Sequence, residues 1–325
     1  MMVWWTWGRL LKALLFGLAL ATAGRFFADQ SWWLDILADF QVQYVAGAVA
    51  LLLASLLVRR IKEAALALVL LAVNVAILAP HVGPLFPVAA APVLVGQAAM
   101  KVVSFNLKFD NRNTAAALDF LRRENADVVT VMEVTKEWRH ALEQLKDIYP
   151  HQFYGPLCRC PGDIPHTDGV LAKRPWREVK AERSPLTGRS FAVWARFASV
   201  QPDKAADLVI AGVHLINPLI YPAGYQITEA VRLASILRGL PGPVIVTGDF
   251  NMTPFSARFG TLLRETGLRR ADGGINASWP TWLTPLGLPL DHILVNAKVG
   301  HAAMWVGPRL GSDHRPIIAR LDLSR

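Results

Sequence analysis

The residue types best suited to catalysis stand where strongly apolar runs of this sequence end. They are carboxylates, amides and imidazoles: Asn106, Glu133, His214, Asp249, Asn251, Asp291, Asp313 and His314. Taken alone, each is more simply a turn-former, a cap or a satisfied buried polar group. Together they supply what phosphoester hydrolysis needs, namely ligands for a divalent cation, a positioner for water and donors for the charge of the transition state.

Glu133 is the clearest candidate for a metal ligand. Its hard carboxylate oxygens favour Mg²⁺ or Mn²⁺. The only cysteines, Cys158 and Cys160, stand two apart without a Cys/His cluster, so zinc is not expected. A bridge across one residue is strained, although a local disulfide stays an alternative in an oxidising compartment, and we assign these cysteines no catalytic role.

The elements that must position these residues begin at about Met100, where short β-like runs alternate with helical patterns. By β-branched content and length we predict strands over 101–107, 127–134, 169–172, 190–196, 208–215, 244–250, 291–295 and 316–323. Helices are predicted over 114–125, 136–146, 228–240, with Thr228 as a cap, and 256–266. Strands that are apolar on both faces, separated by amphipathic helices, indicate sheets covered by helices, with a site at the strand ends.

Six motifs in this region resemble, in order, those of the endonuclease/exonuclease/phosphatase superfamily of deoxyribonuclease I-like proteins. They are Ser104-Phe105-Asn106, Met132-Glu133-Val134, Gly212-Val213-His214-Leu215, Gly248-Asp249-Phe250-Asn251, Leu290-Asp291-His292-Ile293 and Ser312-Asp313-His314-Arg315-Pro316. The resemblance implies an α/β fold, a four-layer αββα sandwich over residues 100–325, which accommodates more strands than one sheet holds comfortably. It also implies a phosphoester hydrolase, a nuclease, phosphodiesterase or phosphatase, that uses Mg²⁺ or Mn²⁺.

The resemblance assigns the metal and the attacking water to one group of residues. Glu133 would be the principal metal ligand, with Asn106 beside it and Asp313 near the metal. Asp249 would orient or deprotonate the water, and Asn251 would hold that water or the phosphate.

The imidazoles would stabilise the phosphoryl group. Asp291 would fix one ring nitrogen of His314, which favours the protonated ring and leaves the other nitrogen to face the substrate. His214 would contact the phosphate from the opposite side.

The chain departs from the family pattern at two positions. Met132 stands where many relatives carry Gln, and Ala172 stands where many carry Ser. Trp279 or Trp282 could stack on a base or sugar or cover apolar lipid, with a packing role as the alternative. Asn217 and Arg189 could line the cleft.

The first hundred residues hold most of the excess that gives the chain a mean hydropathy of +0.31. We predict a transmembrane region over 1–80 with three helices, 10–28, 42–58 and 63–80, each near the ~20 residues that cross a bilayer. A Pro/Ala-rich linker would follow over 81–99. The alternatives are buried helices of a soluble core, a cleavable signal peptide for the first run, and a re-entrant or interfacial helix in the linker.

Basic residues set the expected orientation. Arg9 and Lys12 precede the first span, and Arg59, Arg60 and Lys62 lie between the second and third. Because basic loops stay in the cytoplasm, we expect a multi-pass inner-membrane protein with its catalytic domain outside the cytoplasm, in the periplasm of a Gram-negative cell.

Charge and composition decide little about the substrate. The part after residue 99 carries 34 − 6 = 28 basic and 25 − 4 = 21 acidic residues, which suits an anionic partner. We expect a phosphoester substrate, with nucleic acid slightly favoured over phospholipid or a small phosphate ester. A catalytically silent, membrane-anchored binding domain is the alternative from another class. It predicts erosion of residues that are all present here.

Overall fold

The computed structural model describes residues 2–82, 99–158, 165–199, 206–271, 274–300 and 302–324. The chain forms two compact units. The first comprises Met1–Leu85 with Met252–Gly260, and the second comprises Phe86–Asn251 with Thr261–Arg325. Most of the predicted 81–99 linker lies outside the described residues.

The N-terminal part of the first unit is helical. It contains α1 (Met2–Gly24), α2 (Trp32–Ala38), α3 (Gln41–Leu57) and α4 (Ile61–Leu78). The stretches Trp7–Phe27 and Ile61–His81 are each long and apolar enough to cross a membrane. The pair α2 and α3, bent by 61°, has the composition of either a broken third span or a re-entrant loop. Helices therefore stand near the three predicted ranges, α2 is an additional helix, and the crossing of a membrane stays a prediction.

A polar contact joins three of these helices in their interior. Gln41 Nε2 donates to Asn74 Oδ1 at 2.9 Å, and Asn74 Nδ2 donates to Thr22 Oγ1 at 2.9 Å. All three side chains are buried. Hydrogen bonds between apolar helices of this kind typically contribute ~1 kcal/mol and fix which faces meet.

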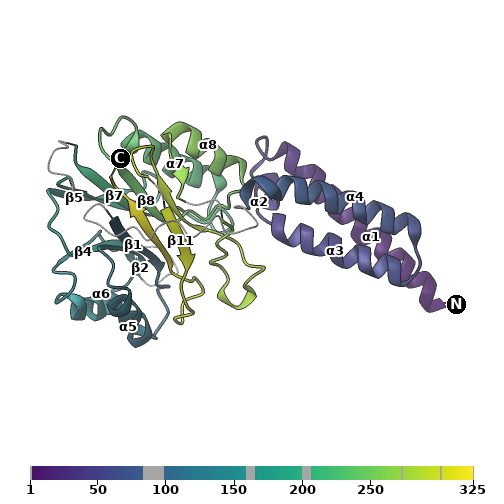
Figure 1. The fold of residues 1–325 in the computed structure, drawn as a ribbon, viewed down its shortest axis with the longest axis horizontal. Coiled ribbons are helices and arrows are strands. Elements are labelled where there is room, and N and C mark those ends of the chain that lie inside the picture. The colour runs from purple at the N-terminus through teal and green to yellow at the C-terminus, as the bar shows by residue number, and fades with distance from the viewer. Residues whose placement is uncertain are drawn as a thin grey trace. The chain divides into compact units, whose positions relative to one another are not determined.

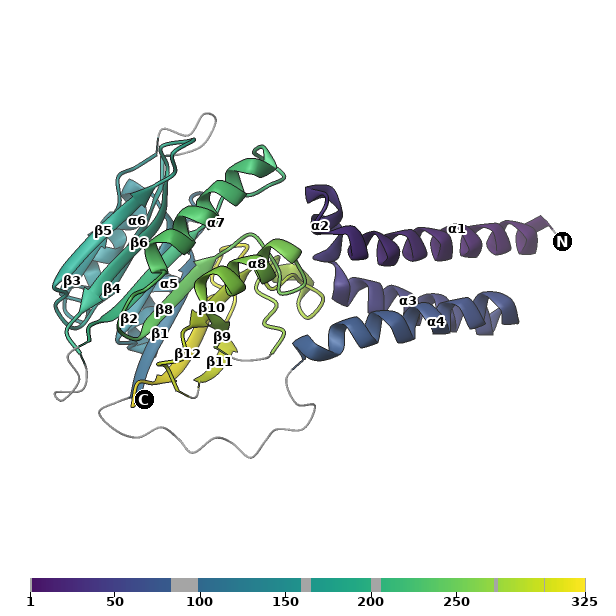
Figure 2. The same ribbon diagram turned by 90° about the horizontal axis from the view of Figure 1, so that it is seen from above.

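The second unit contains two six-stranded sheets. Their orders are β11–β12–β1–β2–β4–β3 and β5–β6–β7–β8–β10–β9 (Figures 1 and 2). The first uses β1 (Ala99–Asn106), β2 (Val128–Val134), β3 (His151–Tyr154), β4 (Thr167–Ala172), β11 (Ala302–Val306) and β12 (Ile317–Asp322). The second uses β5 (Glu178–Arg183), β6 (Ser190–Phe197), β7 (Leu208–His214), β8 (Val244–Asp249), β9 (Arg269–Arg270) and β10 (Asp291–Val295).

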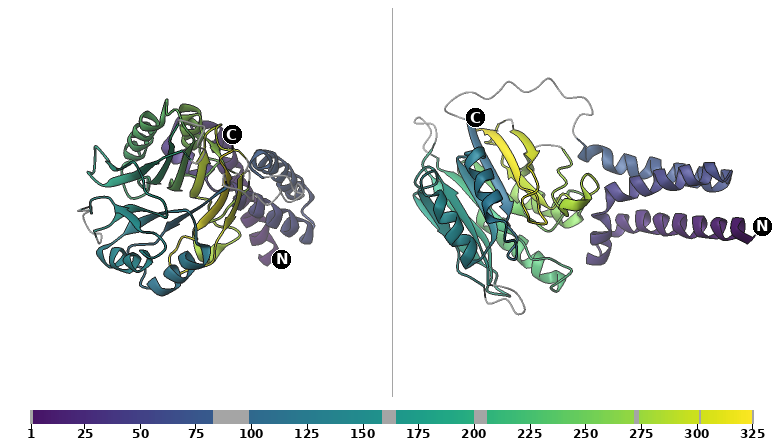
Figure 3. Two further views of the ribbon diagram at one scale, coloured as in Figure 1. Left: turned by 60° about the vertical axis from the view of Figure 1, so that its left-hand side comes forward. Right: turned by 90° about the horizontal axis from the view of Figure 1, so that it is seen from below.

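Side chains alternate between the two faces of a sheet, so successive residues of one strand pack either between the two sheets or against the helices outside. Val102 packs between the sheets with residues such as Ile210, whereas Val103 and Phe105 pack against α5 (Thr114–Glu124) and α6 (Lys136–Leu142). On the opposite outer face lie α7 (Ala223–Leu237) and α8 (Ala257–Thr266) (Figure 3, left). The four-layer αββα sandwich is therefore confirmed.

The directions of the strands bring the polar strand ends to one edge. β1 runs parallel to β2, and β7 runs parallel to β8. Because Asn106 at the end of β1 contacts Asp249 at the end of β8, all four strands end on the same side. β10 is antiparallel to β8 and pairs Asp291 with Asp249, and β12 is antiparallel to β1. The start of β10 and the loop before β12 therefore reach the same edge. A 2.6 Å hydrogen bond between Thr130 and Thr247 ties the two sheets together.

The predicted elements differ from the structure mainly at edges and ends. α7 begins at Ala223, five residues before the predicted start, and Thr228 is not its cap because its hydroxyl donates to Gly224 O inside the helix. Four strands were not predicted: β3, β5, β9 and β11. All four are edge strands of their sheets.

Candidate active site

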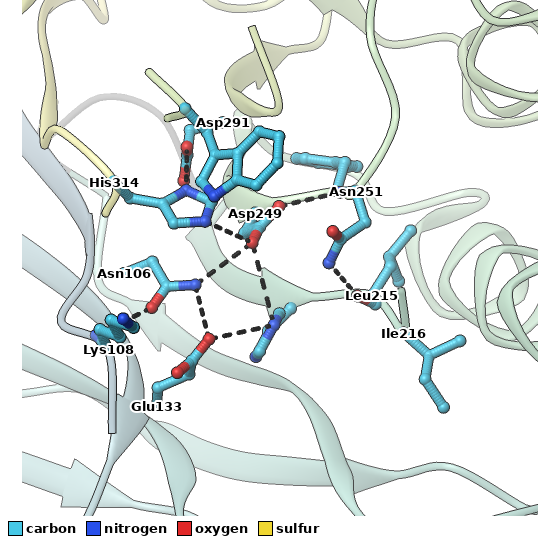
Figure 4. Close-up of polar contacts among 12 residues, drawn as sticks. Asn106, Lys108, Glu133, Leu215, Ile216, Asp249, Asn251, Asp291 and His314 are labelled. Carbon is cyan, nitrogen blue, oxygen red and sulfur yellow. Dashed lines mark hydrogen bonds and ion pairs between the residues drawn. The ribbon is translucent and has the colours of Figure 1, made fainter. Parts of the chain in front are cut away.

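Two carboxylates and one amide meet where β1, β2 and β8 end (Figure 4). Asn106 Nδ2 donates to Glu133 Oε1 at 3.0 Å and to Asp249 Oδ2 at 3.2 Å. Its Oδ1 accepts from Lys108 N at 3.1 Å, and Glu133 Oε2 accepts from Phe109 N at 3.0 Å. Asn106 thus holds the two carboxylates together, and in this orientation its amide oxygen faces the backbone.

The backbone around these side chains adopts conformations that non-glycine residues rarely occupy. Glu133 has a φ of 59° and Asn251 a φ of 49°. Strain of this kind persists where the surrounding structure over-determines it, which is common at functional sites. Gly248, with a φ of 139°, lies so close to β7 that a Cβ would stand 1.9 Å from Val213 O. Asp249 therefore follows a position that requires glycine.

His314 lies between two buried carboxylates. Its Nδ1 is 2.7 Å from Asp291 Oδ2, and its Nε2 is 3.6 Å from Asp249 Oδ2. Burial opposes the charge, but Asp291 and Asp249 outweigh it and raise the pKa of His314 to about 10. Burial also raises the pKa of Asp249, while the nearby imidazolium lowers it and Asp291 raises it further. The ring of His314 is therefore a cation at neutral pH.

His214 faces the same carboxylates in the opposite protonation state. Its Nε2 is 3.9 Å from both Glu133 Oε1 and Asp249 Oδ2, and its Nδ1 is 3.2 Å from Arg189 Nη1. A guanidinium only donates, so Nδ1 accepts and the ring proton sits on Nε2. Burial and then Arg189 lower the pKa of His214 to about 3. The neutral ring thus presents an N–H donor toward Glu133 and Asp249.

A buried network behind His214 joins Arg189, which was predicted to line the cleft and does line the pocket, to Glu229, which the sequence did not single out. Arg189 Nη2 donates to His214 O at 2.7 Å and lies 3.4 Å from Glu229 Oε2. Glu229 also accepts from Ile216 N at 2.8 Å, and Asp168 lies 3.7 Å from His214. Arg189 precedes the apolar run of β6, which is the kind of signal that identified the other site residues. Glu229 lies within α7 and carried no such signal.

Trp279 contacts two residues of the site, whereas Trp282 is mostly exposed. Trp279 Nε1 donates to Asp313 Oδ2 at 3.2 Å, and its ring lies 6.4 Å from that of His314. Trp282 is 72% exposed. Trp279 therefore helps to hold Asp313, the predicted metal neighbour, beside His314.

Asn251 lies on the other side of Asp249. Its backbone N donates to Asp249 Oδ1 at 2.9 Å, and its side-chain Nδ2 donates to Leu215 O at 2.8 Å. Gln226 of α7 donates to the carbonyl of Asn251 at 3.0 Å. Every residue of the predicted set therefore lies at this edge of the two sheets.

A pocket of about 230 Å³ opens over these groups. Its lining combines polar site residues with apolar ones: Phe109, Glu133, His166, Arg189, His214, Ile216, Asn217, Ile220, Tyr221, Asp249 and Asn251. Ile220 is 73% exposed. The pocket gives a substrate access to Glu133, Asp249 and His214 together.

Among the described residues, one cluster of side chains and one carboxylate of the pocket could hold a metal ion. Asp249, Asp291 and His314 offer ligand atoms that all lie within 4.8 Å of one another. A cation there would have to displace the proton of an imidazole that Asp291 holds at 2.7 Å. The carboxylate of Glu133 lines the pocket and needs no such exchange, and its oxygens are the donors that Mg²⁺ and Mn²⁺ prefer.

The model of the Endonuclease/Exonuclease/phosphatase family matches residues 103–314, so the chain belongs to this family, which is commonly a metal-dependent phosphoesterase. The family predicted from the motifs is thus confirmed.

Solved structures share the fold at low identity. An endonuclease/exonuclease/phosphatase from Bacteroides vulgatus is 18% identical with a TM-score of 0.56, over 70% of this chain and 99% of that one. TDP2 from D. rerio, complexed with a single strand DNA product, is 15% identical with a TM-score of 0.56, over 69% and 99%.

A curated relative, a UPF0294 protein of Vibrio cholerae, is 30% identical over 135 residues. The match covers 41% of this chain and 45% of the relative. It therefore spans less than half of either protein.

Proposed function

We propose that this chain is a membrane-anchored, divalent-metal-dependent phosphoester hydrolase that acts outside the cytoplasm. The observation that carries the proposal is the convergence of Glu133, Asp249 and His214 on one pocket, with His314 3.6 Å behind Asp249 and the two imidazoles in opposite protonation states. A structural role alone does not require one buried neutral imidazole and one buried imidazolium around the same carboxylate.

Glu133 would hold Mg²⁺ or Mn²⁺ at the pocket, with Asp313 and Asn106 as the other predicted members of the metal site. When bound, the metal would neutralise charge on the phosphoryl oxygens and make phosphorus more electrophilic. Asn106 would keep Glu133 and Asp249 at a fixed separation, since its amide donates to both carboxylates.

The remaining residues would manage the water and the phosphoryl charge. Asp249, whose pKa burial raises, would position the attacking water and accept its proton. His314 as a cation and His214 through its Nε2–H would stabilise the charge that develops on the phosphoryl oxygens, and Asn251 would orient the water or the phosphate. Water would add to phosphorus and the ester P–O bond would break. The departing oxygen would take up the proton that Asp249 accepted from the water, so that an alcohol is released.

The orientation in the membrane follows the distribution of basic residues. With Arg9 and Lys12 before the first span and Arg59 and Arg60 before the third, the positive-inside rule places the catalytic domain outside the cytoplasm. A reporter fused after Arg325 tests this, because an enzyme that requires periplasmic oxidation should then be active. Activity of a cytoplasm-only reporter at that position would contradict the orientation.

A lipid-like phosphoester is a second candidate substrate beside nucleic acid. Phe109, Ile216, Ile220 and Tyr221 give the pocket apolar walls, and among its described lining residues Arg189 is the only Arg or Lys. Nucleic-acid binding draws most of its affinity from several Lys or Arg contacts to phosphates. The lining therefore favours a substrate with an apolar group next to the phosphate, although TDP2 shares the fold and has been seen with DNA.

The experiment is an activity screen of the full-length chain in detergent micelles with Mg²⁺, Mn²⁺ or EDTA. The substrates are plasmid DNA, a single-stranded oligonucleotide, phospholipid vesicles and the soluble diester bis(p-nitrophenyl) phosphate. We expect EDTA or Glu133→Gln to lower turnover at least about 100-fold. Full activity of Glu133→Gln, or activity that EDTA leaves unchanged, would refute the proposal.

One variant separates the two substrate classes. Ile220→Asn should lower turnover of phospholipid vesicles more than turnover of the single-stranded oligonucleotide, because the side chain is 73% exposed at the rim of the pocket. Equal loss on both substrates, or hydrolysis of nucleic acid alone, would exclude the lipid candidate.

A further inference from the structure

The first compact unit contains a short segment from the far end of the sequence, Met252–Gly260. The segment follows Asn251 directly, and it packs with the part of the chain that connects α1 to α3. Two aspartates of that connection, Asp35 in α2 and Asp39 after it, make the contacts.

Asp39 binds the start of the segment. One oxygen, Oδ1, accepts from Thr253 N at 3.1 Å and from Thr253 Oγ1 at 2.6 Å. Thr253 is fully buried. A single carboxylate oxygen thus fixes both the backbone and the side chain of one residue.

Asp35 binds the end of the segment. Its Oδ2 accepts from Ser256 Oγ at 2.8 Å and from Arg258 Nε at 2.6 Å, and its Oδ1 accepts from Ala257 N at 2.6 Å. The side chain of Asp35 is only 2% exposed. Arg258 also donates to Trp32 O at 3.4 Å, so one side chain binds α2 twice.

These bonds are of the strong kind. Each hydrogen bond to a carboxylate is about twice as strong as a bond between neutral groups, and leaving a buried carboxylate unpaired would be costly. Asp35 also lies at the start of α8, where backbone N–H groups lack helical partners and a negative charge is favourable. The segment is therefore held by charge as well as by shape.

We propose that Asp35 and Asp39, which we call the aspartate clamp, are positioning residues for the hydrolase reaction. They fix Thr253 and Ala257 and so limit the backbone freedom of Asn251, the residue just before the segment. Asn251 has a strained φ of 49° and bonds to Asp249 and Leu215, so a small displacement of the following chain would disturb it. The functional part of this inference rests on the proposed hydrolase activity, whereas the contacts themselves do not.

The test uses the full-length chain in lipid nanodiscs with Mg²⁺ and bis(p-nitrophenyl) phosphate. The variants are Asp39→Ala and Asp35→Ala, with Asp39→Asn as the conservative variant that keeps an acceptor for Thr253. Asp29→Ala, an exposed position on the same connection, is the matched control. Amide hydrogen exchange at 252–260 and the separate values of kcat and KM are measured for each.

We expect both alanine variants to speed exchange of the Thr253 and Ala257 amides at least about tenfold while exchange in β8 stays as in the wild type. We expect kcat to fall about tenfold with little change in KM, because misplaced catalytic groups slow the reaction more than they weaken binding. Asp39→Asn should restore most of both, and Asp29→Ala should change neither.

Each other outcome counts against a stated part of the inference. Unchanged exchange in both alanine variants would overturn the contacts, and faster exchange with unchanged kcat would overturn the positioning role. If the amides of β8 also lost their protection, the alanine variants would be generally unfolded. The kcat of Asp39→Asn would then decide whether the positioning role stands. A wild type that hydrolyses no phosphoester would refute the proposed function, while the exchange data would still judge the clamp.

Discussion

Removing the charge of Asp291 should change the pH range in which the protein works. Asp291→Asn keeps an oxygen near His314 Nδ1 but deletes the carboxylate that lies 2.7 Å away. Because His314 is proposed to act as a cation, the variant should lose activity mainly at high pH, where its imidazole would then deprotonate.

The magnitude follows from the environment of His314. The rise of its pKa from 6.5 to about 10 corresponds to ~5 kcal/mol in favour of the charged ring. A hydrogen bond to a charged group contributes ~1.5–3 kcal/mol, so losing this one should move the alkaline limb of the rate profile down by about 1 to 2 pH units. A shift of two units means about a tenfold loss at pH 9 and less than a twofold loss at pH 6.

The assay is the profile of kcat/KM against pH for bis(p-nitrophenyl) phosphate between pH 5 and 10. Asp119→Asn makes the same chemical change at an exposed position of α5 and should leave the profile unchanged. A loss of the same factor at every pH, or an alkaline limb that does not move, would refute the role of His314 as a cation.

Two further predictions concern stability, each measured by denaturant unfolding of the full chain in detergent. Gly248→Ala should lower the free energy of unfolding by about 3 kcal/mol or more, because its Cβ would stand 1.9 Å from Val213 O. Gly239→Ala, with open space around it, should lower it by about 1 kcal/mol through its positive φ alone. Similar losses for both variants would contradict the close approach. Thr130→Val and Thr247→Val should each lower the free energy of unfolding by ~1 kcal/mol, because each removes the 2.6 Å bond between the two buried hydroxyls, and the double variant should cost less than their sum. Strict additivity would mean that this bond between the sheets contributes nothing.

The central strands could be predicted from the sequence because they are buried on both faces. β10, for example, has the predicted bounds 291–295. β5 could not be predicted, since Glu178, Lys180 and Glu182 interrupt its apolar pattern, and it pairs on one side only. An edge strand is specified by the neighbour to which it bonds, and that neighbour is not visible in the strand's own residues.

The candidate site was predictable to the same extent. Asn106, Glu133 and Asp249 were found because a polar residue at the end of an apolar strand is conspicuous. Glu229 was not, since a carboxylate in a helix looks like a solvated one until the helix face is known. Asp35 follows no apolar strand, and its partners lie more than 200 residues away in the sequence, so nothing local marked it.

The aspartate clamp also bears on how many times the chain crosses the bilayer. A carboxylate and a guanidinium 2.6 Å apart cannot lie on opposite sides of a hydrocarbon layer ~30 Å thick. The chain must therefore cross an even number of times between Asp35 and Arg258. If α4 crosses, α3 must cross as well, so a scheme in which only α1 and α4 span the membrane has the wrong parity, and the scheme with three crossings has the right one.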